Sequence, residues 1–148
     1  MGVCVMVRFL ALIVLAASWS LLQPASALAA QLVAQVSISS QTMTVIHRGR
    51  VIHNWSVSTA RRGKVTPVGS WSAKWLSRHH RSSRYNNAPM PFSIFYNGNF
   101  AVHGTDQISR LGTPASAGCI RLHPSNAARL FELTQQVGLS NTRIVVRR

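Results

Sequence analysis

The sequence predicts a mostly β domain with one principal helix, and three features of the chain lead to that prediction. Residues 31–58 alternate apolar and polar side chains and are rich in β-branched residues, as half-buried strands are. The dipeptide Asn97-Gly98 separates two further strand-like runs, which is typical of a tight hairpin. Residues 124–137 form the one stretch with convincing helical periodicity. With no internal repeat and no low-complexity linker, a single domain is the simplest arrangement.

The first strands are expected between Gln31 and Ser58. The runs QLVAQVSIS and TMTVIH precede an Arg-Gly turn and RVIHNWSVST follows it, so a β-hairpin preceded by another strand is predicted. Residues 59–68 contain basic residues, a glycine and a proline, and are predicted to form a loop. A short strand is expected over residues 71–76. Residues 77–91, SRHHRSSRYNNAPMP, lack an apolar period and are predicted to be a mobile, solvated excursion.

The second half of the chain is expected to begin with a hairpin and to end with a helix and a strand. Residues 92–96 and 100–103 are the predicted hairpin strands, and the second one brings His103 to a strand end. Pro124 suits the first turn of the helix and Gly138 its C-terminal stop. A last strand, TRIVVR, closes the chain. The predicted inward stripe of the helix is Ala127, Leu130, Phe131, Thr134 and Val137.

Residues 1–29 are predicted to be a signal peptide. They carry one charge at Arg8, an apolar run, and two small-x-small sites that place cleavage after Ala27 or Ala29. The alternative is an uncleaved membrane anchor, since the positive region is thin and the apolar stretch is only slightly short for a span. Residues 30–148 are then a single catalytic domain in an exported protein of the periplasm or cell envelope.

The chain is strongly basic, with 16 Lys and Arg residues against two acidic residues and a formal net charge of +14. Such a surface is expected to face anions. Nucleic acid is one class of partner for so basic a protein, but an exported protein meets anionic wall material and lipid headgroups instead. Charge alone does not choose among these partners.

Cys119 is the leading candidate nucleophile. The chain has one other cysteine, Cys4, which lies in the predicted signal peptide, so the mature chain offers Cys119 no disulfide partner. A thiol is mostly protonated at neutral pH and needs a base, and His103 is the candidate because its strand end can hold the imidazole rigidly. A backbone carbonyl is expected to orient the imidazole, with Asp106 as a competitor for that role.

The residues around Cys119 suggest how a substrate is held. Gly118 allows close backbone approach, and the amides of Gly118 and Cys119 are candidate donors to a developing oxyanion. Ser116 is expected to order the turn through its hydroxyl. Arg121 falls on the same face as Cys119 if the segment is extended, where it would bind a substrate carboxylate or hold the thiolate. The alternative for Arg121 is an ordinary surface charge.

The mature chain resembles the catalytic domain of the L,D-transpeptidases, the YkuD type. The carrying motifs are His103-Gly104-Thr105 and, after a fixed spacing, Ser116-x-Gly118-Cys119-Ile120-Arg121-Leu122. Residues 66–69 (TPVG) and 90–92 (MPF) are supporting similarities. The resemblance implies the family's β-sandwich or barrel, with the principal helix following the cysteine.

The resemblance also implies a role for each matching residue. Cys119 corresponds to the nucleophile, His103 to the base, and Gly104 to the position whose carbonyl orients the imidazole. Gly118 and Cys119 correspond to oxyanion donors, with Ser116 beside them, and Arg121 corresponds to a substrate or thiolate contact. No metal or organic cofactor is implied.

The implied reaction is acyl transfer on peptidoglycan stem peptides. The thiolate attacks the L-centre carbonyl of the third residue of a tetrapeptide donor and releases D-alanine, and an amine acceptor takes the acyl group. That acceptor is a neighbouring stem, giving a 3→3 cross-link, or a protein lysine. Alternatives are an L,D-carboxypeptidase that uses water, or a catalytically silent, exported basic module that binds the wall. Ala117 departs from the common pattern of a polar residue, which leaves the donor preference open.

Other histidines and aromatic residues are given plainer interpretations. His123 is an alternative base, but its place before Pro124 favours a role at the helix start. His79 and His80 are predicted to be solvated, or to contact anionic wall components. Trp55, Trp71 and Trp75 are expected to be core or ledge residues. Trp75 and Tyr85 are also candidates to line a substrate groove. Base stacking on Trp75 and Tyr85 is the nucleic-acid alternative, which export and the His103 and Cys119 pair disfavour.

Overall fold

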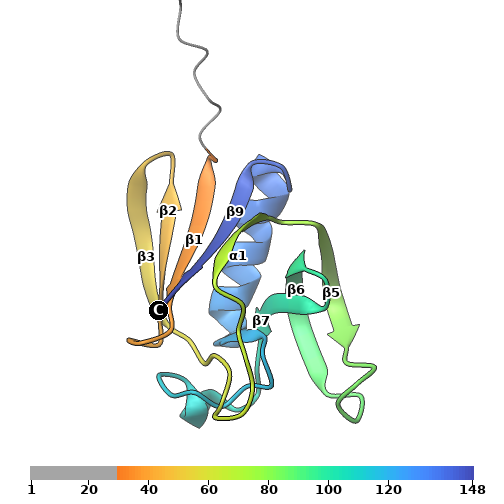
Figure 1. Cartoon of the computed structure of the whole chain (residues 1–148). Coiled ribbons are helices and arrows are strands. Elements are labelled where there is room, and N and C mark those ends of the chain that lie inside the picture. The colour runs from red at the N-terminus through yellow and green to blue at the C-terminus, as the bar shows by residue number, and fades with distance from the viewer. Residues whose placement is uncertain (1–29) are drawn as a thin grey trace, which may run out of the picture.

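The computed structural model describes residues 30–148, which form two β-sheets and one long helix (Figure 1). The predicted cleavage sites and the signal peptide of residues 1–29 lie outside the described residues. Among the described residues, no helix is long and apolar enough to span a membrane. The prediction of a mostly β domain with one principal helix is confirmed.

The first sheet has five strands in the order β3-β2-β1-β9-β4. Their bounds are β1 Leu32–Ser37, β2 Thr42–His47, β3 Arg50–Ser56, β4 Gly69–Ser72 and β9 Thr142–Arg147. The three N-terminal strands pair antiparallel as the alternation predicted, while β9 pairs parallel to β1 and antiparallel to β4. The C-terminal strand is therefore central to this sheet.

The second sheet has four strands in the order β5-β6-β7-β8. Their bounds are β5 Trp75–Arg81, β6 Pro89–Asn97, β7 Phe100–Gly104 and β8 Ile120–Leu122. The β6–β7 hairpin turns at Asn97-Gly98 as predicted. A short 3₁₀-helix, η1 Ile108–Arg110, lies in the connection between β7 and β8. The pairing of β7 with β8 is parallel, so the chain leaves the end of β7 and returns to its beginning.

Helix α1 spans Pro124–Val137, the predicted range, with Pro124 at its first position and Gly138 at its C-cap. It packs against β6 and β7 and also touches β1, so it closes the core between the sheets (Figure 1). The inward stripe is confirmed except at two positions: Leu133 is buried as well, and Val137 is half-buried. The side chains fully buried in the main core include Leu32, Val36, Met43, Val45, Ile94, Tyr96, Ile120, Leu122, Leu130 and Ile144.

The prediction of one strand over residues 71–76 is wrong, because two strands from different sheets meet there. Ser72 ends β4 in the first sheet and Trp75 begins β5 in the second. Between them, the amide of Ala73 donates to Thr142 O at 3.0 Å and that of Lys74 to Phe95 O at 2.8 Å. The chain crosses from one sheet to the other within two residues, and each residue bonds to a different sheet.

The prediction of an excursion over residues 77–91 is wrong where β5 and β6 occupy that range, although most of these residues are exposed as predicted. Strand β5 continues to Arg81 and β6 begins at Pro89, which leaves only residues 82–88 as a connecting turn. Ser82 holds this turn, since its hydroxyl accepts from the amides of Arg84 and Tyr85 at 3.2 and 3.1 Å. Tertiary pairing with β6 therefore overrides the missing apolar period.

A reversal of the alternation in β6 explains why the period is missing. Phe92 has φ +55°, and the pairing of β5 with β6 is interrupted at Arg78 and Phe92, although the register is the same on both sides of the interruption. As a result Met90 and Phe95, which ordinary alternation would place on opposite faces, belong to one apolar cluster. That cluster lies beside Cys119.

Candidate active site

His103 is held rigidly on β7. The imidazole is only 6% exposed, and its Nδ1 lies 2.7 Å from the carbonyl oxygen of Gly104. A carbonyl can only accept a hydrogen bond, so Nδ1 carries the proton and donates it. Nε2 of the neutral ring is then the atom available to take up a proton. The Gly104 carbonyl, not the Asp106 carboxylate, therefore orients the ring, as the resemblance implied for Gly104.

The environment keeps His103 neutral. Burial is the main cause that lowers the pKa of His103 from 6.5 to about 4, and the positive charges of Arg121 and His80 act in the same direction. The hydrogen bond to Gly104 opposes this shift. At neutral pH the side chain is an unprotonated base, which is the form that can accept a thiol proton.

Cys119 immediately precedes β8 and lies on the same face as His103. The parallel register pairs Val102 with Ile120 and His103 with Arg121, so continuing it back by one residue sets Cys119 beside Ala101. Because alternate residues share a face, Cys119, Arg121 and His103 all lie on one side of the sheet. The structure thus brings together the predicted nucleophile, the predicted base and Arg121.

The thiol of Cys119 is protonated at rest. Burial raises the pKa of Cys119, while a backbone hydrogen bond at Ala101 and the charge of Arg121 lower it. The S–H donates to the carbonyl of Asn99 with a sulfur–oxygen distance of 3.8 Å. Both members of the pair are therefore uncharged before a substrate arrives, and the reaction must begin with proton transfer from sulfur to the imidazole.

The turn before Cys119 is ordered by Ser116, as predicted. Ser116 is fully buried, and its hydroxyl accepts from the amide of Gly118 at 3.0 Å. Gly118 has φ +140°, and a Cβ there would lie 2.7 Å from Cε1 of Phe100. Glycine is therefore required on both conformational and steric grounds. The sequence predicted the amides of Gly118 and Cys119 as oxyanion donors. Because the Gly118 amide already donates to Ser116, the Cys119 amide is the remaining candidate.

The loop between β3 and β4 packs along this turn, a feature that the sequence did not reveal. The carbonyl of Thr59 accepts from the amides of Ala115 and Ser116 at 3.0 and 2.9 Å. The hydroxyl of Thr66 donates to Gly118 O at 2.8 Å and accepts from the Ala60 amide at 3.0 Å. Thr66 is the first residue of the TPVG similarity, which was the one sequence signal for this contact.

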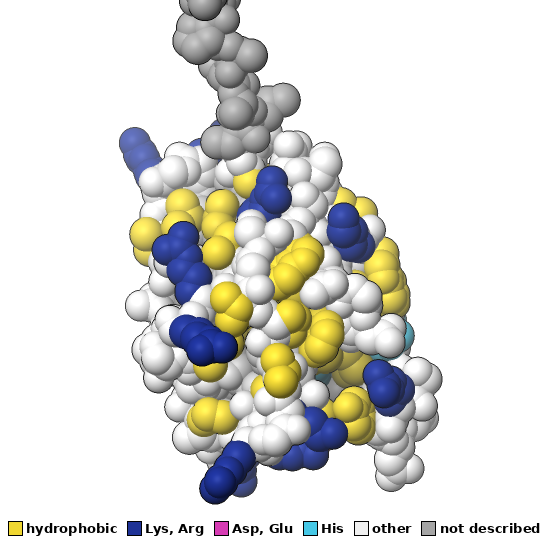
Figure 2. All heavy atoms as spheres, in the orientation of Figure 1, with side chains coloured by type: hydrophobic (Ala, Val, Ile, Leu, Met, Phe, Trp, Pro, Cys, Tyr) yellow, Lys and Arg dark blue, Asp and Glu magenta, His cyan; other side chains and the backbone are white. Residues whose placement is uncertain are grey.

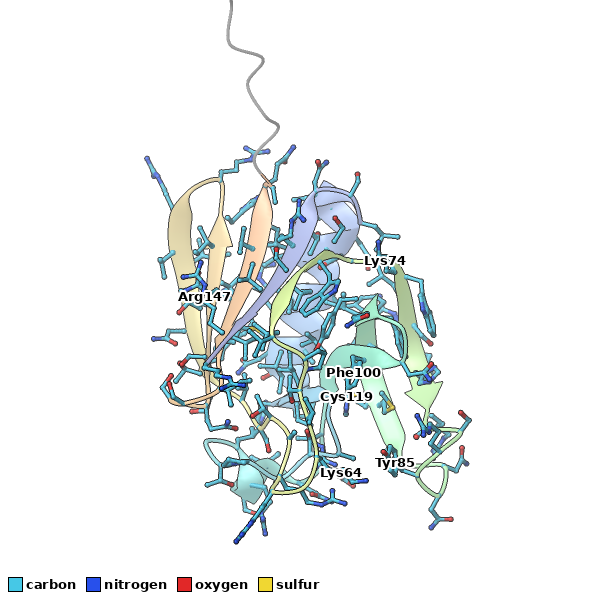
Figure 3. All side chains as sticks on the ribbon, in the orientation of Figure 1. Lys64, Lys74, Tyr85, Phe100, Cys119 and Arg147 are labelled. Carbon is cyan, nitrogen blue, oxygen red and sulfur yellow. The ribbon has the colours of Figure 1, made fainter. Side chains whose placement is uncertain are left out.

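A cavity of about 580 Å³ opens over Cys119, and His103 and Arg121 line it as well. Figure 3 shows Cys119 next to Phe100, with Tyr85 on the connection between β5 and β6. This volume is in the range of sites that enclose small ligands. Further lining residues include Arg61, His80, Arg84, Met90, Phe95, Asp106, Gln107, Ser116 and Ala117.

Arg121 is oriented by a neutral partner. Its guanidinium donates to Oε1 of Gln107 at 3.0 Å, from the segment that follows β7. Burial lowers the pKa of Arg121, Cys119 and Asp106 raise it, and the nearby charges of Arg61 and Arg110 lower it. Arg121 is thus a half-buried cavity residue rather than the ordinary surface charge that was the alternative.

The structure changes the interpretation of His80 and supports that of His123. His80 lines the cavity with its ring 4.9 Å from that of Phe95, so its predicted solvated role is wrong, whereas His79 is exposed. His123 is the N-cap of α1, where its Nδ1 accepts from the Ser125 amide at 3.3 Å, and this confirms the helix-start role.

The aromatic residues also occupy the predicted kinds of position. Trp55 and Trp71 pack against the main core, while Trp75 is 44% exposed and stacks on Phe95 with ring centroids 3.7 Å apart. Tyr85 lines the cavity, as one of the two predicted groove residues. Within residues 30–148, no three His, Cys, Asp or Glu side chains are grouped so that they could hold a metal ion.

Comparison with known proteins places this geometry in a family context. Residues 31–146 match the model of the YkuD L,D-transpeptidase catalytic domain. A putative L,D-transpeptidase YkuD of Bacillus subtilis (strain 168) is 24% identical over 117 residues, which are 76% of this chain and 64% of that protein. This chain therefore spans less than two thirds of the length of that relative.

Solved structures share the fold. The L,D-transpeptidase LdtMt1, solved in complex with imipenem, aligns with a TM-score of 0.71 and 25% identity over 79% of this chain and 59% of that chain. An L,D-transpeptidase from Mycobacterium smegmatis aligns with a TM-score of 0.72 and 22% identity over 80% of this chain and 59% of that chain.

Proposed function

The chain belongs to the family of L,D-transpeptidase catalytic domains, and from this membership we propose that it is a cysteine acyltransferase acting on peptidoglycan stem peptides. The observation that carries the proposal is the arrangement of His103 and Cys119 on one face of the second sheet, lining one cavity. The base is neutral and oriented by Gly104, and the thiol lies beside a backbone turn that only glycine can form.

The first half of the reaction makes a thioester. The Cys119 proton passes to Nε2 of His103, and the sulfur attacks the L-centre carbonyl of the third residue of a tetrapeptide donor. The Cys119 amide donates to the oxyanion of the tetrahedral intermediate. Collapse of this intermediate breaks the carbon–nitrogen bond, and the imidazolium returns the proton to the amine of departing D-alanine.

The second half transfers the acyl group. An acceptor amine attacks the thioester, gives a proton to His103 and releases Cys119, which regains that proton as a thiol. With an amine of a neighbouring stem the product is a 3→3 cross-link, and with a protein lysine it is a protein attached to the wall. With water, the product is a tripeptide and the enzyme is an L,D-carboxypeptidase.

The proposed place of action is the cell envelope, reached by export through residues 1–29. Their composition supports this, since they combine one arginine, an apolar run and small-x-small sites. Stem peptides are then the partners, and the basic surface also suits anionic envelope components.

The test is intact-protein mass spectrometry of the full chain mixed with a tetrapeptide-stem muropeptide. A thioacyl adduct with release of D-alanine is expected for the wild type, and Cys119→Ala should lose both. This variant keeps Cys4, so loss of the adduct assigns it to Cys119. Imipenem, which is bound in the structure of LdtMt1, serves as a second acylating probe.

The small products distinguish the candidate activities. A cross-linked dimer identifies a transpeptidase, and a tripeptide alone identifies a carboxypeptidase. If the wild type forms no adduct and releases no D-alanine, the proposed nucleophile is wrong and a silent wall-binding module takes its place.

A further inference from the structure

Two arginines share one wall of the cavity over Cys119. Arg121 is the middle residue of β8. Arg61 comes from the loop between β3 and β4, sixty positions earlier in the chain. Arg61 was not among the site residues predicted from the sequence. The positive charge of Arg61 lowers the pKa of Arg121, and both side chains line the same cavity.

Backbone hydrogen bonds fix the main chain of Arg61 relative to that of Arg121, while the Arg61 side chain is exposed. Ser58 and Arg121 exchange amide–carbonyl bonds of 3.0 and 2.9 Å, and the amide of Arg61 donates to Ser116 O at 2.9 Å. Arg61 is therefore attached at its backbone to the same turn that carries Cys119. Its position does not depend on a flexible loop, because Thr66 also ties this loop to Gly118.

Within residues 30–148, Arg61 and Arg121 make no ion pair, although the carboxylate of Asp106 acts electrostatically on Arg121. The ion pair found within residues 30–148 joins Arg129 to Glu132 on helix α1, and neither residue lines the cavity. Asp106 is the single acidic residue lining the cavity, and it makes no ion pair there with Arg61 or Arg121 within 4.0 Å. Arg84 adds another guanidinium to the lining. Such an arrangement favours an anionic ligand, and guanidinium groups suit carboxylates in particular.

We propose that Arg61, together with Arg121, binds a free carboxylate of the donor stem and makes the cavity select stems with that carboxylate over stems in which it is amidated. This inference rests on the proposed function for the identity of the ligand as a stem peptide. Two carboxylates near the scissile bond could supply the chemistry: the terminal one of D-alanine and the side-chain one of a diaminopimelate third residue. Arg61 is here a specificity-determining residue, not a member of the proton-transfer pair.

The experiment compares three donors: a tetrapeptide stem with both carboxylates free, one with the terminal D-alanine amidated, and one with the diaminopimelate side-chain carboxylate amidated. The full chain is assayed, as wild type, Arg61→Gln, Arg61→Lys and Arg62→Gln, for release of the terminal residue, which is D-alanine from two of the donors and D-alaninamide from the donor amidated at its terminus. Arg62 is the matched control because it is exposed, adjacent in sequence and absent from the cavity lining. Binding of each donor to Cys119→Ala, with and without Arg61→Gln, is measured by calorimetry.

One amide should be a poorer donor than the free acid for the wild type, which identifies the carboxylate that is bound. Arg61→Gln should lower kcat/KM for the free acid about 10- to 100-fold, mainly through KM, because a charge-assisted hydrogen bond is lost. With the amidated donor that the wild type disfavours, Arg61→Gln should have the same kcat/KM as the wild type. Arg61→Lys should restore part of the preference for the free acid, and Arg62→Gln should leave kcat/KM unchanged for every donor.

An equal loss on all three donors would show a structural role for Arg61 and overturn the inference, as would an unchanged preference in Arg61→Gln or a wild type that does not distinguish acid from amide. The calorimetric arm separates this inference from the proposed function. If the wild type turns over no donor but Cys119→Ala still prefers the free acid in an Arg61-dependent manner, the carboxylate site stands and the proposed reaction fails.

Discussion

At the scale of single residues, His103 and Cys119 are both uncharged before the reaction. Burial lowers the pKa of the imidazole and raises that of the thiol, so the ion pair that many cysteine nucleophiles use is disfavoured at rest. The nearby charge of Arg121 favours a thiolate once the proton has moved. The thiolate therefore has to form by transfer of the thiol proton to His103 as part of the reaction.

The low pKa of His103 predicts how stability depends on pH. Protons bind the unfolded imidazole below about 6.5 but the folded one only below about 4, so acid favours unfolding over that window. Lowering the pH from 7 to 4.5 should reduce the free energy of unfolding by roughly 2 kcal/mol through this residue alone, and the reduction is complete below pH 4. Urea unfolding of the full chain at the two pH values measures it.

The control for this prediction is His103→Gln, which removes the titrating group. Its loss of stability between the two pH values should be smaller than that of the wild type by about the same roughly 2 kcal/mol. The chain has only two acidic residues, so carboxylate titration contributes little to either curve. A variant that loses as much stability as the wild type would contradict the assignment.

At the scale of elements, the loop between β3 and β4 acts as a support for the turn that carries Cys119. Thr59 and Ser58 bond to this turn and to β8, and Thr66 fastens the far end of the loop to Gly118. The loop thus links the first sheet, where β3 and β4 lie, to the candidate site in the second. Loss of this link should disturb the position of Cys119, although no reacting group is removed.

Thr66→Val tests that link. The variant keeps the shape of the side chain but leaves the Gly118 carbonyl and the Ala60 amide without their buried partner, at a cost of about 1–3 kcal/mol each. We expect a lower free energy of unfolding and faster hydrogen exchange at the Ala60 amide. Thr66→Ser retains the hydroxyl and should stay close to the wild type. Full protection of Ala60 in Thr66→Val would show that the loop docks without this residue.

The elements also show which parts of the structure were accessible to sequence reasoning. Helix α1 and the turn at Asn97-Gly98 follow from local signals and were predicted, whereas β6 begins at Pro89, three residues before the predicted start of the hairpin. The β5–β6 hairpin was missed because Phe92 reverses the alternation and because Trp75 stacks on Phe95, which lies on another strand. Such non-local contacts leave no period in the sequence.

The residues of the candidate site also divide into those that local motifs reveal and those that only non-local contacts place there. His103, Gly104, Ser116, Gly118, Cys119 and Arg121 lie in two short motifs and were named from the sequence. Arg61, Thr66 and His80 reach the site from loops and strands far away in the chain, and basic or polar residues of that kind are common in this sequence. Thr66 had a sequence signal in the TPVG similarity, whereas Arg61 and His80 are placed at the site only by the tertiary structure.

At the scale of the whole molecule, positive charge is spread over the surface. Figure 2 shows Lys and Arg side chains scattered across the visible face rather than gathered into one patch. With a formal net charge of +14, the protein should be attracted to polyanionic wall material from many orientations, in addition to the specific contacts within the cavity.

This attraction predicts that binding to isolated sacculi falls several-fold when salt is raised from 0.1 M to 1 M, because the screening length shortens from about 10 Å to about 3 Å. Co-sedimentation of the full chain with sacculi measures it. The double variant Arg48→Gln and Arg50→Gln removes two charges beside the β2–β3 turn and should weaken the salt dependence. Since neither residue lines the cavity, turnover of a soluble donor should stay unchanged in that variant. Binding that persists at 1 M salt would instead indicate that contacts within the cavity hold the protein on the wall.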